Sequence, residues 1–164
     1  MDLSYISARL SSGEYEATVE EIIAARGEGL FIQEMRDAFD SDIGDARVAL
    51  MVVKLTKSII VTTNYDRVLE NALAIQGETA AEMVTPAEDN ARIIRAQSNG
   101  QRALLKLHGD IRTPSSYVLS KAQYDASYGG GLPDMKLSLP RKLRHIFEHS
   151  SLLFLGCSLI GDRT

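Results

Sequence analysis

One short stretch limits the fold of this chain more than any other. Residues 58–63 read SIIVTT, a β-branched run without a charge, and an apolar-periodic segment at 66–75 follows almost at once. A short β-branched run of this kind is typical of a central parallel strand. The apolar residues of the following segment recur at helical spacing. The stretch therefore predicts a strand, a polar junction and a helix, which is the repeating unit of α/β folds.

Other segments extend this alternation. Further strands are expected at 103–107, 117–119 and 152–155, and further helices at 121–127 and 141–149. The first part reads as helical at 14–26, 30–39 and 46–55, and the last of these is apolar nearly all round, which predicts burial. The pattern predicts one α/β domain over 1–164 with a Rossmann-like, doubly wound parallel sheet. Its helical part spans about 1–56, and its sheet and ligand site span about 57–164.

The composition argues against several classes of function. With 18 basic and 22 acidic side chains, the formal net charge is −4, which gives no electrostatic footprint for nucleic acid. No apolar run approaches the roughly 20 residues that span a bilayer, and the N-terminus lacks a signal-peptide pattern. We therefore expect a cytoplasmic protein without direct nucleic-acid or membrane partners. A single cysteine, Cys157, and three histidines without HExxH spacing lead us to expect metal-free chemistry.

Three of the expected strands end in polar clusters. TTNYD stands at 62–66, KLHGD at 106–110 and GCSLIGD at 156–162. Because parallel strands share a direction, their C-terminal ends lie on one edge of the sheet, where open α/β sheets bind ligands. We expect the three clusters to meet in one crevice.

Each candidate residue also has a purely structural interpretation. The Asn64 amide can hold a ribose hydroxyl or a water molecule, but it can equally form a turn. Asp66 precedes a helix, where aspartate is a favoured N-cap. His108 can act as a general base, or it can be a satisfied histidine at a strand end. Cys157 is expected to be an inert small core residue. Taken singly, these positions leave both interpretations open.

Taken in order, TTNYD, KLHG, YVLSKAQY and LLFLGCSLIGD resemble the sirtuin-like superfamily. Within it they are most similar to the silent-information-regulator-like domains of bacterial anti-phage defence proteins, over roughly residues 46–162. The resemblance implies a Rossmann-like fold and NAD as the ligand. It implies that His108, Asn64 and Asp66 are catalytic, with Asn64 and Asp66 at the nicotinamide ribose. It places NAD-binding residues at Thr62, Thr63, Asn64, Asp66, Gly156 and Ser158, the last two on the adenosine side.

Two departures from the family pattern refine the expectation. Protein-deacylating sirtuins generally carry a four-cysteine zinc module after the HG motif, and no cysteine stands there in this sequence. The chain is therefore more similar to NAD-hydrolysing members. The GAGxS loop, which cradles the NAD diphosphate in the family, is also absent. By analogy it would stand before Met1, so we expect the fold to be incomplete at both ends.

The resemblance implies an NAD+ glycohydrolase domain that cleaves the nicotinamide–ribose bond in a bacterial defence protein. NAD is then the substrate, no metal takes part, and a C-terminal domain or a sensor protein is the expected partner. Formation of a homo-oligomer is left open. Three alternatives stand beside this expectation. They are an inactive, regulatory NAD- or nucleotide-binding module, a protein deacylase, and an unrelated α/β domain with coincidental polar strand ends.

Overall fold

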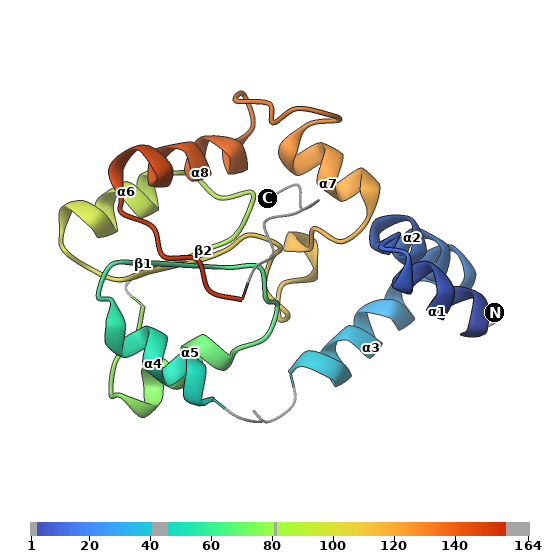
Figure 1. Cartoon of the computed structure of the whole chain (residues 1–164), viewed down its shortest axis with the longest axis horizontal. Helices are drawn as coiled ribbons and strands as arrows, with labels where there is room; N and C mark the ends of the chain where they lie inside the picture. Colours follow the sequence, from blue (N-terminus) through green and yellow to red (C-terminus); the bar gives the residue numbers. More distant parts are fainter. Residues whose placement is uncertain (1–2, 41–45, 81, 157–164) are drawn as a thin grey trace.

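The protein is described from a computed structural model, which covers residues 3–40, 46–80 and 82–156 (Figure 1). Its N-terminal helical part consists of α1 (Leu3–Ser11), α2 (Tyr15–Arg26) and α3 (Glu28–Phe39). The helices expected at 14–26 and 30–39 are thus confirmed, whereas α1 was not expected. In Figure 1 these helices stand to one side of the sheet, next to α7 (Lys121–Tyr128).

A small parallel sheet forms the centre of the rest of the chain. It contains β1 (Ile59–Thr62), β2 (Glu82–Val84) and β3 (Ala103–Lys106) in the order β1-β3-β2. Its connections are α5 (Val68–Ile75) between β1 and β2, and α6 (Ala91–Ser98) between β2 and β3. The chain continues through a 3-10 turn at Pro114–Ser116 and α7 to α8 (Ser138–His149). Both strand pairs are parallel, and Thr62 stands opposite Lys106.

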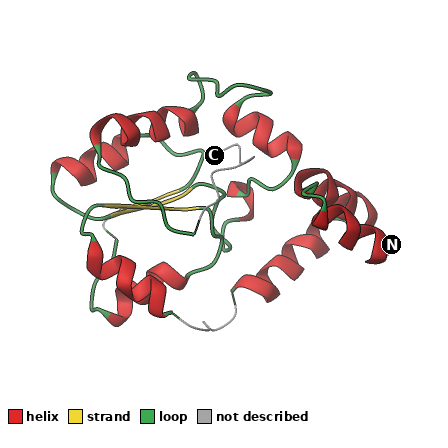
Figure 2. Ribbon diagram, viewed as in Figure 1, coloured by secondary structure: helices red, strands yellow, loops and turns green. Residues whose placement is uncertain are grey.

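Helices cover both faces of the sheet, which makes three layers (Figure 2). On one face, α4 (Arg47–Leu55) and α5 enclose a core that includes Val53, Leu73 and Leu104. On the other face, the core includes Leu105 and Ile146 and is covered by α6 and α8. Neighbouring β3 residues therefore point into opposite cores, as a strand requires. The expected Rossmann-like α/β fold is confirmed.

Two expected strands are wrong. Residues 117–119 are irregular and pair with no described strand, because Val118 uses its N–H for the His108 carbonyl (2.9 Å) and its carbonyl for the Tyr65 hydroxyl (2.9 Å). Residues 152–155 are irregular and between 40% and 67% exposed, and no described strand pairs with them. An apolar run forms a strand only where a neighbouring strand satisfies its backbone.

The burial of α4 and the position of β2 also differ from expectation. Only Ala49 and Val53 of α4 are buried, while Val48, Met51 and Leu55 are 68–70% exposed. No strand was expected around β2, because its three residues are bounded by polar and alanine-rich sequence.

A buried lysine ties α8 to the loop after β2. Lys142 is 1% exposed, and its Nζ donates to the carbonyls of Thr85 (3.0 Å) and Pro86 (2.7 Å). Burial disfavours the charged ammonium and lowers the Lys142 pKa to about 8. Within the described ranges, no helix has the length and apolar character needed to cross a membrane.

Candidate functional site

The polar segments that follow β1 and β3 lie together at one edge of the sheet. The two strands are parallel neighbours, so their C-terminal ends coincide. Beyond the ladder, Leu107 N–H donates to the Thr62 carbonyl (2.8 Å) and Ile111 N–H donates to the Tyr65 carbonyl (3.0 Å). The predicted convergence of TTNYD with KLHGD is therefore confirmed. Of the third predicted cluster, only Gly156 lies within the described residues; Cys157, Ser158 and Asp162 lie outside them.

The segment after β1 carries an exposed amide, that of Asn64, and a partly buried carboxylate, that of Asp66, which bonds to the backbone two residues on. Thr62 is partly buried, Thr63 and Asn64 are exposed, and the Thr62 hydroxyl accepts from Asn64 N–H (3.1 Å). Asp66 Oδ1 accepts from Val68 N–H (3.0 Å), the first residue of α5. Arg67 rather than Asp66 is the N-cap of this helix, so the expected N-cap role of Asp66 is wrong by one position. Its bond to the backbone two residues on forms a turn that leads into α5 and shapes the junction that carries Asn64.

The imidazole of His108 is half-buried among aromatic rings. Its Nε2 lies 3.1 Å from the Tyr124 hydroxyl, and its carbonyl accepts from Val118 N–H. The ring centroids of Tyr65 and Tyr124 stand 6.1 and 5.4 Å from the imidazole. Main chain and ring of His108 are therefore both held by neighbouring segments.

Sequence reasoning missed the residue that joins the two polar segments. Lys106, the last residue of β3, is 1% exposed. Its Nζ lies 2.8 Å from Glu70 Oε1 and 2.7 Å from Asp110 Oδ2, and it also donates to the carbonyls of Tyr65 and Asp66. One ammonium thus compensates two nearly buried carboxylates and fixes the junction after β1. The available signal was a charge at the end of a strand that is otherwise apolar, with an aspartate four residues later.

The glycine after His108 is required by the packing of the backbone. Gly109 has φ +98°, and a Cβ atom there would come within 2.3 Å of the Ser116 carbonyl oxygen. The same serine accepts from Asp110 N–H through its Oγ (3.0 Å). A side chain at 109 would push the 3-10 turn away from the strand edge, so the HG pair is a local structural necessity.

Two tyrosines, the partly buried Tyr65 and the buried Tyr117, hold the loops together. Tyr65 donates its hydroxyl proton to the Val118 carbonyl and Tyr117 donates to the Ile111 carbonyl (2.7 Å). Burial raises the pKa of Tyr65 far above its usual value and raises that of Tyr117 as well. Both hydroxyls therefore stay protonated at neutral pH and keep these hydrogen bonds.

The helical part contacts this region through its own side chains. Glu20 of α2 accepts from Ala122 N–H at the start of α7 (3.1 Å), and the Phe39 ring stands 6.3 Å from that of Tyr65. Asp40, which follows α3, pairs with Arg112 (3.3 Å). These contacts anchor the helical part beside the loops that bear His108 and Asn64.

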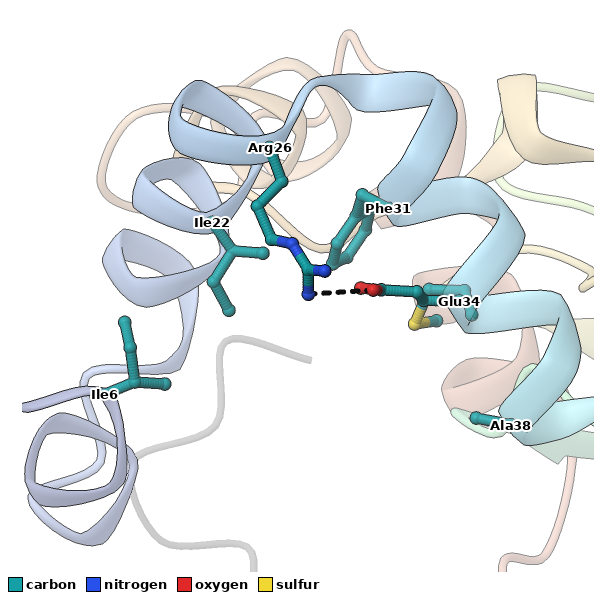
Figure 3. Close-up of a pocket in the computed structure, with 7 residues that line it drawn as sticks. Ile6, Ile22, Arg26, Phe31, Glu34 and Ala38 are labelled. Atoms are coloured by element: carbon teal, nitrogen blue, oxygen red, sulfur yellow. Dashed lines mark ion pairs between the residues drawn. The ribbon is translucent and has the colours of Figure 1, made fainter. Parts of the chain in front are cut away.

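A separate groove lies among α1, α2 and α3 (Figure 3). Its lining is mostly apolar and contains the ion pair Arg26–Glu34 (2.8 Å). The lining residues are Ile6, Ile22, Arg26, Phe31, Glu34, Met35 and Ala38. None of these residues follows β1 or β3, so the groove is distinct from the strand-edge site. Within residues 3–40, 46–80 and 82–156, no three histidine, cysteine or carboxylate side chains gather in a way that could hold a metal ion.

Comparison with known proteins identifies the family of this chain. The SIR2-like domain family matches residues 58–163, which begin just before β1 and include both polar segments. Defense-associated sirtuin 2 of Bacillus subtilis is 26% identical over 155 residues, which make up 93% of this chain and 14% of that protein. The chain thus spans about a seventh of the length of this relative, and the similarity includes the helical part as well as the sheet. On the family match, which covers well over half of its residues, the chain belongs to the SIR2-like domain family.

Proposed function

We propose that this chain is an NAD+ glycohydrolase domain that cleaves the nicotinamide–ribose bond and belongs to a bacterial anti-phage defence protein. The observation that carries the proposal is the parallel pairing of β1 with β3, which puts the exposed Asn64 amide and the His108 imidazole on one sheet edge. Membership of the SIR2-like family and similarity to a defence-associated sirtuin support the choice of NAD and of a defence context.

Cleavage of the nicotinamide–ribose bond needs few catalytic groups from the protein. Cleavage of the bond between C1′ and nicotinamide passes through an oxocarbenium-like transition state, as in glycoside hydrolysis. Nicotinamide leaves from a pyridinium, so it needs no proton from an acid. The site must orient a water molecule, stabilise positive charge on the ribose and exclude bulk water.

The described side chains can divide these tasks. Asn64 offers two donors and one acceptor at the surface of the junction and would orient the attacking water or a ribose hydroxyl. His108 would accept a proton from that water or from the ribose. Asp66 would act by holding the junction in shape, because its carboxylate accepts from Val68 N–H and its carbonyl accepts from Lys106.

The test uses the complete parent protein and measures by chromatography how fast it releases nicotinamide from NAD+. We expect His108→Ala to lower kcat by about 10²–10⁴-fold, the usual cost of losing an acid–base group. Asn64→Ala removes the amide that would orient the water, so it should lower kcat as well. His149→Ala and Asn99→Ala are matched controls, since His149 is exposed on α8 and Asn99 follows α6. The controls should keep full activity and all four variants the wild-type circular dichroism. Unchanged release in both site variants would refute the assignment.

A second function, binding of NAD without turnover, is favoured by one observation. The Asp66 carboxylate and the His108 Nε2 both already have protein partners, which is how structural residues behave. Such a regulatory module would bind NAD+ saturably in calorimetry and release no nicotinamide. Measuring both quantities on the same preparation distinguishes the two functions.

A further inference from the structure

The segment YVLSKAQY at 117–124 has no role in the chemistry above, yet it contacts His108 twice. The Tyr124 hydroxyl lies 3.1 Å from His108 Nε2, and the two rings meet edge to face with centroids 5.4 Å apart and planes at 71°. Six positions before Tyr124, Val118 donates its N–H to the His108 carbonyl (2.9 Å). One segment therefore holds both the main chain and the imidazole of His108.

Tyr124 is itself held in place by the start of α7. Ser120 and Gln123 form a complete capping box, in which the Ser120 hydroxyl accepts from Gln123 N–H and the Gln123 side chain accepts from Ser120 N–H. Tyr124 follows in the first turn of this helix, and its ring stacks on that of Tyr128 at 5.9 Å. A capped helix end and a stacked ring leave the hydroxyl little freedom to move away from His108.

We propose that Tyr124 is a positioning residue that sets the ring orientation and the proton distribution of His108. An imidazole has two distinct nitrogens, and the hydrogen bond made by one decides which of them carries the proton. A phenol hydroxyl is a better donor than acceptor, so a hydroxyl at Nε2 favours the neutral tautomer that carries its proton on Nδ1. The edge-to-face contact adds a second restraint on rotation of the imidazole.

The structural half of this inference is tested on the chain alone, without NAD. The ¹⁵N chemical shifts of the His108 ring nitrogens report how the proton is shared between Nδ1 and Nε2. In Tyr124→Phe, which keeps the ring contact and removes the hydroxyl, we expect the ratio of the two neutral tautomers to change by roughly two- to tenfold, the effect of one ordinary hydrogen bond. Tyr117→Phe is the matched control, because it removes a buried hydroxyl that bonds to Ile111 instead. Identical His108 shifts in wild type and Tyr124→Phe would overturn the proposal.

The catalytic half rests on the proposed function and uses the complete parent protein. A residue that acts by positioning His108 should lower kcat for nicotinamide release by a similar two- to tenfold factor in Tyr124→Phe, with KM within twofold of wild type. Full kcat in Tyr124→Phe beside an active wild type contradicts the positioning role. If the wild type releases no nicotinamide, the proposed function fails, and the NMR comparison alone decides whether Tyr124 controls His108.

Discussion

Replacing Lys106 by methionine removes the ammonium that pairs with two nearly buried carboxylates. Lys106 is 1% exposed, and the side chains of Asp110 and Glu70 are 6% and 14% exposed. Methionine fills a similar volume, so the change leaves little cavity and isolates the electrostatic effect. Two negative charges then remain in a region of low dielectric, and the carbonyls of Tyr65 and Asp66 lose a donor.

Breaking a buried ion pair by deleting one partner costs about 3–5 kcal/mol in the free energy of unfolding. For a chain of 164 residues, each kcal/mol corresponds to about 2–4 °C in Tm, so Lys106→Met should lower Tm by roughly 6–20 °C. Urea unfolding measures the change in free energy and thermal unfolding measures the change in Tm. Both are monitored by circular dichroism, because the sequence has no tryptophan to report by fluorescence.

A neutralised variant separates charge from packing. If uncompensated charge causes the loss, the triple variant Lys106→Met with Glu70→Gln and Asp110→Asn should be more stable than Lys106→Met by at least about 1 kcal/mol, although it carries two more substitutions. Asparagine at 110 can still accept from Arg112 N–H, as Asp110 does at 2.9 Å. A cost below about 1 kcal/mol for Lys106→Met, or a triple variant less stable than the single one, would show that uncompensated charge is not the cause of the loss.

Two further predictions concern packing and pH. Gly109→Ala should destabilise the chain severely, because its Cβ would lie 2.3 Å from the Ser116 carbonyl oxygen. Gly100→Ala, with φ +63° and open space around the Cβ, should lower the free energy of unfolding by only about 1 kcal/mol in the same urea experiment. Equal costs for the two variants would contradict the close approach at Gly109. The folded-state pKa of Lys142 is about 8 and lies below its unfolded value, so the unfolded chain binds more protons between about pH 8 and pH 10. The contribution of Lys142 to the free energy of unfolding should therefore rise with pH across this window, by up to about 1.4 kcal/mol per pH unit. Comparison of wild type with Lys142→Met should reveal it, and parallel pH profiles of the two proteins would argue against a depressed pKa.

The sequence predicted those parts of the fold that depend on local pattern. The strand at 58–63, the helix after it and the strand at 103–107 are found at β1, α5 and β3, because a β-branched run and helical spacing are local signals. The shared direction of parallel strands was enough to predict that the segments containing Asn64 and His108 lie at one edge of the sheet. These elements needed no knowledge of distant contacts.

The rest depends on contacts between residues far apart in sequence. Residues 117–119 have strand-like composition, but their backbone groups are taken by His108 and Tyr65, which no local pattern records. The sequence alone suggests that Lys106 is a surface charge, because its partner Glu70 is 36 positions away and only the fold places the two side chains together. The contact of Tyr124 with His108 likewise joins a helix to a strand end. Such tertiary contacts override the propensity of the residues that make them.

We propose that the edge formed by β1 and β3 binds the nicotinamide ribose of NAD. The most direct test is a titration of the ¹⁵N-labelled chain with NAD+, in which NMR signals are followed residue by residue. We expect saturable shift changes centred on the Asn64 side-chain amide, residues 62–66 and 108–110, with the Asn99 amide unmoved as an internal control. Shift changes that are absent at this edge, or that gather instead on the groove among α1, α2 and α3, would contradict it.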